Sequence, residues 1–333
     1  MGEVFSSVPF SGRKPEAGRK PVSHLWWSKI KIPIPPSMPK KLAAWLAQGR
    51  LFARGRRLYA ENRQNWNMPL SKLDKLRTGL YLILDDYAKG LFPPTFRDQQ
   101  IAYANEIAYR NNLGGTTVEQ SLLADMRKPF WAAKSTAKFL GDFARLLTCI
   151  ERCGVLPPAH VLELGCGSGW TAEFLAVRGY AVTGTSIAEV DIAAARKRIA
   201  SLQAKGLNSS LRFELAPMET VAEVVGPKED YDVVLVYEAL HHAFDWRKAL
   251  ESSFACLKPG GWLIVCSEPN LLRTFISYRV AKLSNTREIG FSRGELLRHL
   301  RHSGYRPIRY LGSRFHFWIK NHWICAQKPC RSQ

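Results

Sequence analysis

The residues with the clearest chemical meaning are one carboxylate and three glycines at positions 163–169. Glu163 is followed by Gly165, Gly167 and Gly169, and the apolar run at 161–164 is typical of a buried parallel strand. Glycines at alternate positions free the backbone and leave bare main chain against which a ligand can lie. The sequence therefore predicts a ligand-binding loop where this strand ends.

The spacing of the glycines limits which ligand the loop can hold. A dinucleotide loop has the form G-x-G-x-x-G, with the pyrophosphate on a helix N-terminus. Here the third glycine comes one residue early, and Trp170 stands in the required position. Glu163 would repel phosphates but would suit a positive group such as an α-ammonium. NAD is therefore disfavoured.

This segment resembles the first motif of the class I S-adenosylmethionine-dependent methyltransferases, E/D-x-G-x-G-x-G. Two later segments resemble further family features in the required order. Residues 231–242 look like the fourth strand with the loop after it, and residues 257–266 look like the turn into strand five. The resemblance covers roughly residues 129–328.

Hydrophobic periodicity predicts the same α/β architecture. Strand-like runs lie at 161–164, 181–185, 211–215, 231–236 and 262–266, and helix-like stretches lie at 170–178, 189–205 and 245–257. Further strands near 306–311 and 315–325 would form a terminal antiparallel hairpin. We predict a Rossmann-like, doubly wound, mostly parallel seven-stranded sheet with an N-terminal helical extension.

The resemblance implies S-adenosyl-L-methionine as the cofactor, held at the strand ends. The implied cofactor-binding residues are Glu163, Gly165, Cys166, Gly167, Gly169, Thr185, Ser186, Ile187, Met218, Glu219, Tyr237 and Glu238. Ser186 stands where the family has an acidic ribose ligand, so cofactor binding would be weaker unless Glu189 or Asp191 reaches back. At the adenine site, Pro217 removes one backbone donor.

The candidate catalytic residues follow the fourth strand. A sulfonium is already an activated leaving group, so the protein mainly aligns the nucleophile and excludes water. An oxygen nucleophile also needs a general base, for which His241 and His242 are candidates; the alternative is that one ring only braces the loop. Tyr237 is expected near the methyl group.

Neither a metal site nor a disulfide framework is expected. The seven cysteines contain no C-x-x-C pair and fall mostly in predicted core elements. We expect reduced thiols and a cytoplasmic protein, because no signal peptide or membrane span is recognisable.

The chain divides into three predicted regions. Residues 1–40 form a proline-rich basic arm, residues 41–128 a helical accessory region, and residues 129–333 the methyltransferase domain. Accessory helices are expected at about 42–63, 72–88, 96–112 and 117–127, and a helix at about 135–152 leads into the first strand. A partly helical lid is expected at 268–291; its cations and aromatics would suit an acidic substrate or would serve only packing and solvation.

The net charge of +20 favours anionic partners, and the first 150 residues hold 24 lysines and arginines against 11 acidic residues. The aromatic stripe of Trp45, Phe52 and Tyr59 would pack on neighbouring helices or lie on an anionic membrane, which would make the protein peripheral there. Nucleic acid is disfavoured as a substrate, because the N/D-P-P-Y-like sequence of the amino-methyltransferases is absent after strand four.

The sequence therefore predicts an enzyme that moves a methyl group to an oxygen or nitrogen of a small-molecule, glycan or lipid-intermediate acceptor. The alternatives are an RNA methyltransferase and a noncatalytic protein that binds S-adenosylmethionine.

Overall fold

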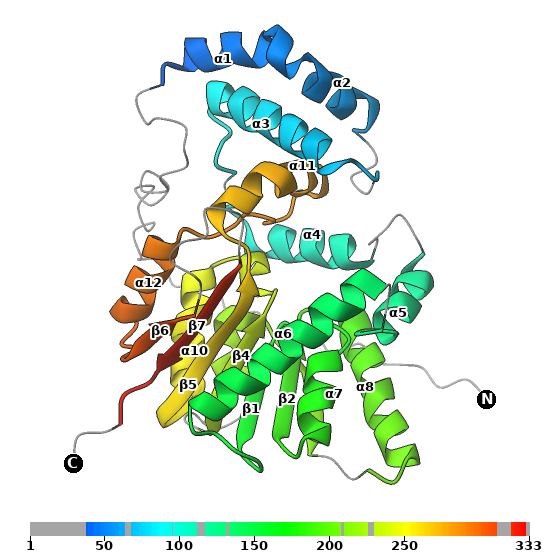
Figure 1. Ribbon diagram of the computed structural model, residues 1–333, viewed down its shortest axis with the longest axis vertical. Helices are drawn as coiled ribbons and strands as arrows, with labels where there is room; N and C mark the ends of the chain where they lie inside the picture. The colour runs from blue at the N-terminus through cyan, green and yellow to red at the C-terminus, as the bar shows by residue number, and fades with distance from the viewer. Residues whose placement is uncertain are drawn as a thin grey trace, which may run out of the picture.

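The computed structural model describes residues 38–63, 68–94, 96–111, 117–130, 133–207, 210–225, 230–311 and 321–330. A seven-stranded sheet forms the lower part of the molecule, and short helices stack above it (Figure 1). The strands are β1 (His160–Leu164), β2 (Ala181–Ser186), β3 (Leu211–Leu215), β4 (Tyr231–Tyr237), β5 (Leu257–Glu268), β6 (Ile308–Tyr310) and β7 (His322–Gln327). The helices are α1 (Lys40–Gln48), η2 (Arg50–Phe52), α2 (Ala53–Glu61), α3 (Lys72–Lys89), α4 (Gln99–Asn111), α5 (Val118–Met126), α6 (Ala133–Arg152), α7 (Trp170–Val177), α8 (Glu189–Ala204), η4 (Met218–Thr220), α9 (Val221–Val224), η5 (Leu240–His242), α10 (Trp246–Cys256), η6 (Leu271–Arg273), α11 (Thr274–Ser284) and α12 (Arg293–His302).

The strand order β3-β2-β1-β4-β5-β7-β6 confirms the predicted doubly wound sheet. Strands β1 to β5 pair in parallel, because helices connect them, while β7 runs antiparallel to both β5 and β6. The carboxyl ends of the parallel strands therefore meet at one edge of the sheet, where ligands of such folds bind.

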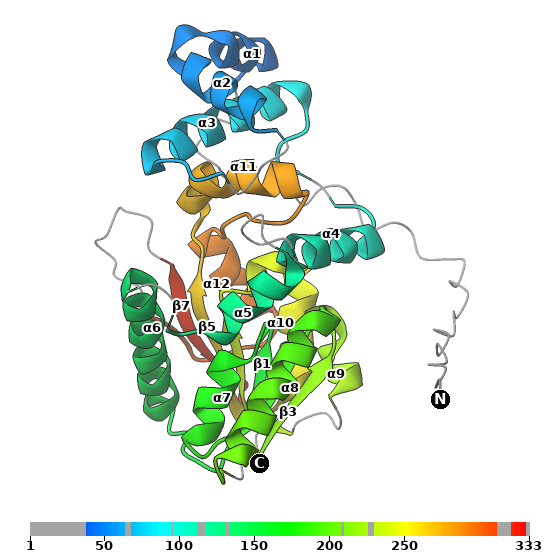
Figure 2. The same ribbon diagram turned by 90° about the vertical axis from the view of Figure 1, so that its right-hand side faces the viewer.

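Helices cover both faces of the sheet. The side chains of α6, α7 and α8 pack on one face around Leu175, Val233 and Ile264, and those of α10 and α12 pack on the other around Leu250 and Leu296. Figure 2 shows α6 on one side of the sheet and α10 on the other. This double covering explains why the central strands are apolar along their whole length.

The first helices form a separate small core above the sheet. Helices α1 and α2 pack on α3, and α3 packs on α11, with Leu82, Ile83 and Tyr278 buried between them. A Cβ added at Gly79 of α3 would lie 1.8 Å from the Phe275 carbonyl oxygen of α11, so only glycine allows this approach. The carboxylate of Asp86 accepts a hydrogen bond from Tyr278 and pairs with Lys282. The α11 segment thus connects the two cores (Figures 1 and 2).

Most expected elements occur within a few residues of their predicted ranges, and two differ. The single helix expected at 42–63 is wrong: it breaks at Gly49, and η2 leads into α2. The turn expected at 257–261 is the irregular start of β5, with Gly260 at φ 84° and a register shift against β4. Part of the strand expected at 315–325 and most of the basic arm at 1–40 lie outside the described residues.

Within the described part of the chain, every helix is too short or too polar to cross a membrane.

Candidate active site

A cavity of about 420 Å³ lies at the carboxyl ends of the parallel strands. Its floor is the glycine loop after β1 and the ends of β2 and β4, and its walls include residues of α4, α6 and the β5–α12 connection. Helix α4 supplies Tyr103, Glu106, Tyr109 and Arg110. A segment from the predicted accessory region therefore completes the cavity.

Glu163 and the glycine loop form the centre of the floor. Gly165 and Gly167 have φ of 65° and 52°, and a Cβ at Gly165 would lie 2.6 Å from both Ala239 Cβ and Met218 Cε. The Glu163 side chain is buried, and its carboxylate accepts hydrogen bonds from Thr171 and the Ala172 amide. Burial raises the pKa of Glu163 to about 8. Its Oε2 atom has no hydrogen-bond partner, as an atom awaiting a ligand's ammonium would have.

At the end of β2, Ser186 stands where the family has an acidic residue, and a carboxylate of α8 lies beside it. The Ser186 hydroxyl donates to Asp191 Oδ2 at 3.1 Å, so Asp191 does reach back from the first turn of α8. Arg110 of α4 donates to the other Asp191 oxygen at 2.9 Å and also pairs with Asp125. Ser186, Asp191 and Arg110 line the cavity, so a carboxylate lies beside position 186.

At the end of β3, Met218 and Glu219 both line the cavity. The Glu219 carboxylate accepts a hydrogen bond from the Tyr103 hydroxyl at 2.7 Å and one from the Asp245 amide at 2.9 Å. Its oxygens thus tie α4 and the start of α10 to the sheet. Met218 packs against the core and lines the cavity with a polarizable thioether.

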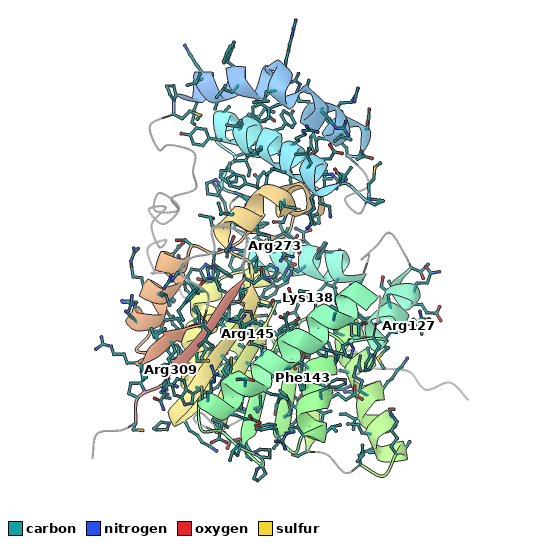
Figure 3. All side chains as sticks on the ribbon, viewed as in Figure 1. Arg127, Lys138, Phe143, Arg145, Arg273 and Arg309 are labelled. Carbon is teal, nitrogen blue, oxygen red and sulfur yellow. The ribbon has the colours of Figure 1, made fainter. Side chains whose placement is uncertain are left out.

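The end of β4 carries Tyr237 and Glu238. The Tyr237 hydroxyl donates to Asp142 of α6 at 2.9 Å, and burial raises the pKa of Tyr237, which keeps it neutral. Glu238 has φ 48°, rare for a residue with a side chain, and accepts a hydrogen bond from Lys138 at 2.8 Å. Figure 3 shows Lys138 on α6 below Arg273, both near the cavity end of the sheet.

His241 and His242 follow on η5, and each imidazole Nδ1 faces a carboxylate. His241 Nδ1 lies 2.9 Å from Glu268 Oε2, and His242 Nδ1 lies 3.0 Å from Glu106 Oε2. Both Nε2 atoms are directed toward Glu288, at 3.9 and 3.7 Å from its oxygens. The structure therefore brings both predicted histidines into the cavity and surrounds them with three carboxylates.

The charges in this cluster are strongly coupled. Burial alone would lower the pKa of His242, but Glu106, Glu288 and Glu268 outweigh it and raise that pKa to about 9. Glu268 is fully buried, and burial would raise its pKa, but His241 and the amides of Leu240 and Ala239 lower it overall. These amides fix the Glu268 carboxylate, which in turn fixes the His241 ring.

Two of the implied cofactor residues do not line the cavity. Gly169 begins α7 with φ 76°, and a Cβ there would lie 2.6 Å from the Phe213 ring, so its role is close packing. The Thr185 hydroxyl donates to the Glu163 carbonyl at 3.2 Å and supports the loop from behind. The other implied residues line the cavity: Glu163, Gly165, Cys166, Gly167, Ser186, Ile187, Met218, Glu219, Tyr237 and Glu238.

Four residues around the histidine pair could not be recognised in the sequence as site residues. Glu106, Tyr109 and Arg110 lie on a helix with no recognisable motif, and Glu288 lies in a connection of irregular pattern. Of the carboxylates around the histidines, Glu268 could have been recognised from the sequence, because a carboxylate at the last position of a parallel strand lies at the edge of the sheet where ligands bind.

The cations and aromatics of the expected lid serve mainly to pack it. Tyr278 and Lys282 bind Asp86 of α3, and Arg287 donates to the carbonyls of Ala243 and Phe244. Of the cations at 268–291, Arg273 lines the cavity. Lys128 also lines it, whereas Phe130 is 62% exposed and Trp131 lies outside the described residues.

The aromatic ring of Trp170 does not close the loop. It is buried among Phe139, Phe143, Phe174 and Tyr237, with ring centroids 5.6–6.2 Å away, and it lines the cavity as part of its wall. A nucleoside-sized space with a carboxylate under it remains open.

A parallel sheet with this loop, this carboxylate and this cavity defines a methyltransferase. The model of the methyltransferase domain family matches residues 139–316, more than half of the chain, and the chain belongs to that family. The resemblance to the class I S-adenosylmethionine-dependent methyltransferases is thereby confirmed, with S-adenosyl-L-methionine as the cofactor.

Among the proteins that the chain is similar to are two O-methyltransferases and one methyltransferase of known structure. It is 32% identical over 161 residues to the ubiquinone biosynthesis O-methyltransferase of Bordetella avium, and 36% identical over 116 residues to that of Bordetella pertussis. These matches cover 47% and 34% of this chain and 63% and 44% of the relatives. Magnesium protoporphyrin IX methyltransferase from Synechocystis, with bound S-adenosylhomocysteine, superposes with a TM-score of 0.50 at 18% identity, over 69% of this chain and all of that one, and shares the fold.

Proposed function

We propose that the protein transfers the methyl group of S-adenosylmethionine to a hydroxyl oxygen on the aromatic ring of a small molecule. The observation that carries this proposal is the pair of imidazoles, each held by a carboxylate, at the side of the cavity away from Ser186. The names of the relatives, which are O-methyltransferases acting in ubiquinone biosynthesis, support an oxygen acceptor.

The cofactor supplies a methyl group on a positively charged sulfur. Glu163 would hold its α-ammonium, Ser186 and Asp191 its ribose, and Met218 would cover the adenine. The unpartnered Glu163 oxygen and the two positive-φ glycines beside it support this assignment. These residues bind and orient; the barrier falls because the acceptor oxygen is aligned behind the methyl carbon and water is excluded.

The acceptor's own proton explains why a hydroxyl fits the histidine pair. As the new C–O bond forms, the S–CH₃ bond breaks and its electron pair stays on sulfur, which becomes neutral. The hydroxyl proton must leave to a base, and His241 or the carboxylates around it can accept it. A phenolic hydroxyl, with a pKa of about 10 like that of tyrosine, gives up a proton far more readily than an aliphatic alcohol. Tyr237 would contact the methyl region without changing its charge.

The proposal is tested by offering four acceptors to the full chain with S-adenosylmethionine: a dihydroxybenzoate, an aliphatic alcohol, a primary amine and a short RNA. We expect S-adenosylhomocysteine release above the solvent background, and a methyl ether by mass spectrometry, only with the dihydroxybenzoate. Methylation of the amine or the RNA instead, or of none of the four, would overturn the proposal.

We also propose that α1, η2 and α2 contact an anionic membrane surface. Of the predicted aromatic stripe, Phe52 and Tyr59 pack toward α3, whereas Trp45 is 71% exposed and neighbouring Leu51 is 81% exposed. Arg54 and Arg57 are also largely exposed. Apolar side chains flanked by arginines on one short helical segment suit the interface of an anionic bilayer.

For this second proposal, the Trp45→Ser/Leu51→Ser double variant should lose membrane binding. We expect the native chain to sediment with phosphatidylcholine vesicles only when they contain phosphatidylglycerol, because both charge and apolar contact are needed. Leu156→Ser is the matched control, since Leu156 is 62% exposed on the loop before β1. Recovery of the native chain in the supernatant with both vesicle types would refute the membrane contact.

A further inference from the structure

Three potential ligand atoms converge on one point of the acceptor side. The Nε2 atoms of His241 and His242 and the carboxylate of Glu288 all lie within 4.8 Å of one another. The two nitrogen-to-oxygen distances, 3.9 and 3.7 Å, are too long for hydrogen bonds. They are only slightly wider than the roughly 3.4 Å that separates two ligands of a tetrahedral divalent ion.

The groups behind these ligands orient them in the way metal sites require. Glu268 and Glu106 accept from Nδ1–H of the two histidines, so Nε2 is the ring nitrogen that each would offer to a metal, with loss of its proton where the ring is charged. The Tyr109 hydroxyl donates to Glu288 Oε1 at 2.9 Å and holds that carboxylate in turn. A carboxylate behind each metal-binding imidazole is a recurrent arrangement, because it fixes the tautomer and raises ligand basicity.

The charge of the cluster also favours a cation. Three carboxylates, Glu106, Glu268 and Glu288, face two imidazoles in a largely buried site. The nearest cations do not occupy the point of convergence, since Arg287 donates its guanidinium to the carbonyls of Ala243 and Phe244 and Arg273 donates to Asn321.

We propose that His241, His242 and Glu288 bind one divalent transition-metal ion such as zinc, with one coordination position open to the cavity. Two imidazoles and one carboxylate form the ligand set of catalytic zinc sites and suit nitrogen-preferring ions over magnesium. No metal site was expected from the sequence, and the ligands come from two segments 46 positions apart with no metal-binding spacing.

The site deepens the proposed methyl transfer and rests on it. An ion held there would contact the acceptor's hydroxyl oxygen and lower the pKa of that hydroxyl, and because the ion would occupy His241 Nε2, the proton would leave to a neighbouring carboxylate or to water instead of to that nitrogen. The protein would fix the position of the ion. η5 carries both histidines, and the backbone amides of Ala239 and Leu240 hold the Glu268 carboxylate behind His241.

The test uses the full chain, stripped with a chelator and titrated with Zn²⁺, Co²⁺ and Mg²⁺. We expect one Co²⁺ with visible bands of nitrogen and oxygen ligands, Zn²⁺ binding by calorimetry, and no response to Mg²⁺. His241→Ala and Glu288→Gln should abolish this binding, and Glu106→Gln should weaken it by about 10- to 100-fold. His160→Ala, at the opposite end of β1, is the matched control and should bind like the native chain.

Cobalt binding that is equal in native, His241→Ala and Glu288→Gln chains, or that shows the near-ultraviolet band of thiolate ligands from the Cys149, Cys153 and Cys325 group, would overturn the metal site. Melting temperatures verify that each variant folds. Titration with S-adenosylhomocysteine in the presence of chelator separates the two proposals. Methyl transfer that proceeds equally well without any metal would refute only the part of the metal in the reaction, whereas metal binding without methyl transfer to the dihydroxybenzoate would refute only the proposed function.

Discussion

The His241→Ala variant should turn over at least a hundredfold more slowly than the native chain while binding S-adenosylhomocysteine equally well. His241 is buried beside the acceptor side of the cavity, and its ring is fixed by Glu268, which three backbone amides hold in place. A positioned proton acceptor contributes about 10²- to 10⁴-fold to a rate. Release of S-adenosylhomocysteine with a dihydroxybenzoate measures turnover, and calorimetry measures nucleoside affinity.

His160→Ala is the control for this prediction, because His160 is half-exposed at the far end of β1 and should leave both quantities unchanged. If His241→Ala keeps native turnover, the ring only braces the loop after β4, which is the alternative that the sequence left open. If it loses nucleoside affinity to the same degree as turnover, the ring supports the cofactor pocket instead of the acceptor.

The second large effect concerns Glu163, whose loss should stabilise the empty protein and weaken the cofactor complex. Burial raises its folded pKa to about 8 from 4.5, so the folded chain keeps the proton that the unfolded chain releases. The contribution of this proton to the free energy of unfolding is fully present below pH 4.5. It is lost as the pH rises to about 8. The total loss is on the order of 5 kcal/mol at most.

Glu163→Gln removes the titration and keeps the shape. The free energy of unfolding of this variant should equal that of the native chain near pH 4.5 and exceed it by several kcal/mol at pH 9, measured by denaturant titration at both pH values. Its affinity for S-adenosylhomocysteine should fall by roughly tenfold to a hundredfold, because a hydrogen bond to a charged group is lost. A stability difference that does not change with pH, or an unchanged affinity, would contradict a buried carboxylate that waits for an ammonium.

The opposite signs of these two effects explain how such a residue persists. A buried carboxylate with one unsatisfied oxygen is costly in the empty protein, and only the bound ligand can offset that cost. Sites that bind ligands often give up stability in this way.

The fold could be predicted because its signals are local. The central strands are continuous apolar runs and the helices have clear periodicity, so β1, β2 and β3 lie within one residue of their expected ranges. The break at Gly49 was harder, because a glycine within an otherwise helical pattern is often tolerated. Here Gly49 ends α1, and Gly55 of α2 lies against the Arg77 carbonyl of α3, where a Cβ would be 2.6 Å away.

The strand-end residues of the site and the histidine pair could also be predicted, but the partners of the two histidines could not. Glu163 and Ser186 stand at the ends of strands, where sequence position fixes their place in space. The partners of His241 and His242 come from α4, the end of β5 and the α11–α12 connection, and their meeting depends on how α4 and α11 dock above the sheet. Docking of that kind depends on side-chain contacts such as Gly79 against Phe275, which leave no periodic pattern.

The central claim is that the cavity holds the cofactor with its ammonium on Glu163 and its sulfur toward the histidine pair. A crystal structure of the native chain with S-adenosylhomocysteine tests it most directly. We predict the homocysteine nitrogen within hydrogen-bonding distance of Glu163 Oε2, the ribose at Ser186 and Asp191, and the sulfur facing His241 and His242. A nucleoside bound elsewhere, or bound here with its sulfur directed away from η5, would contradict the assignment.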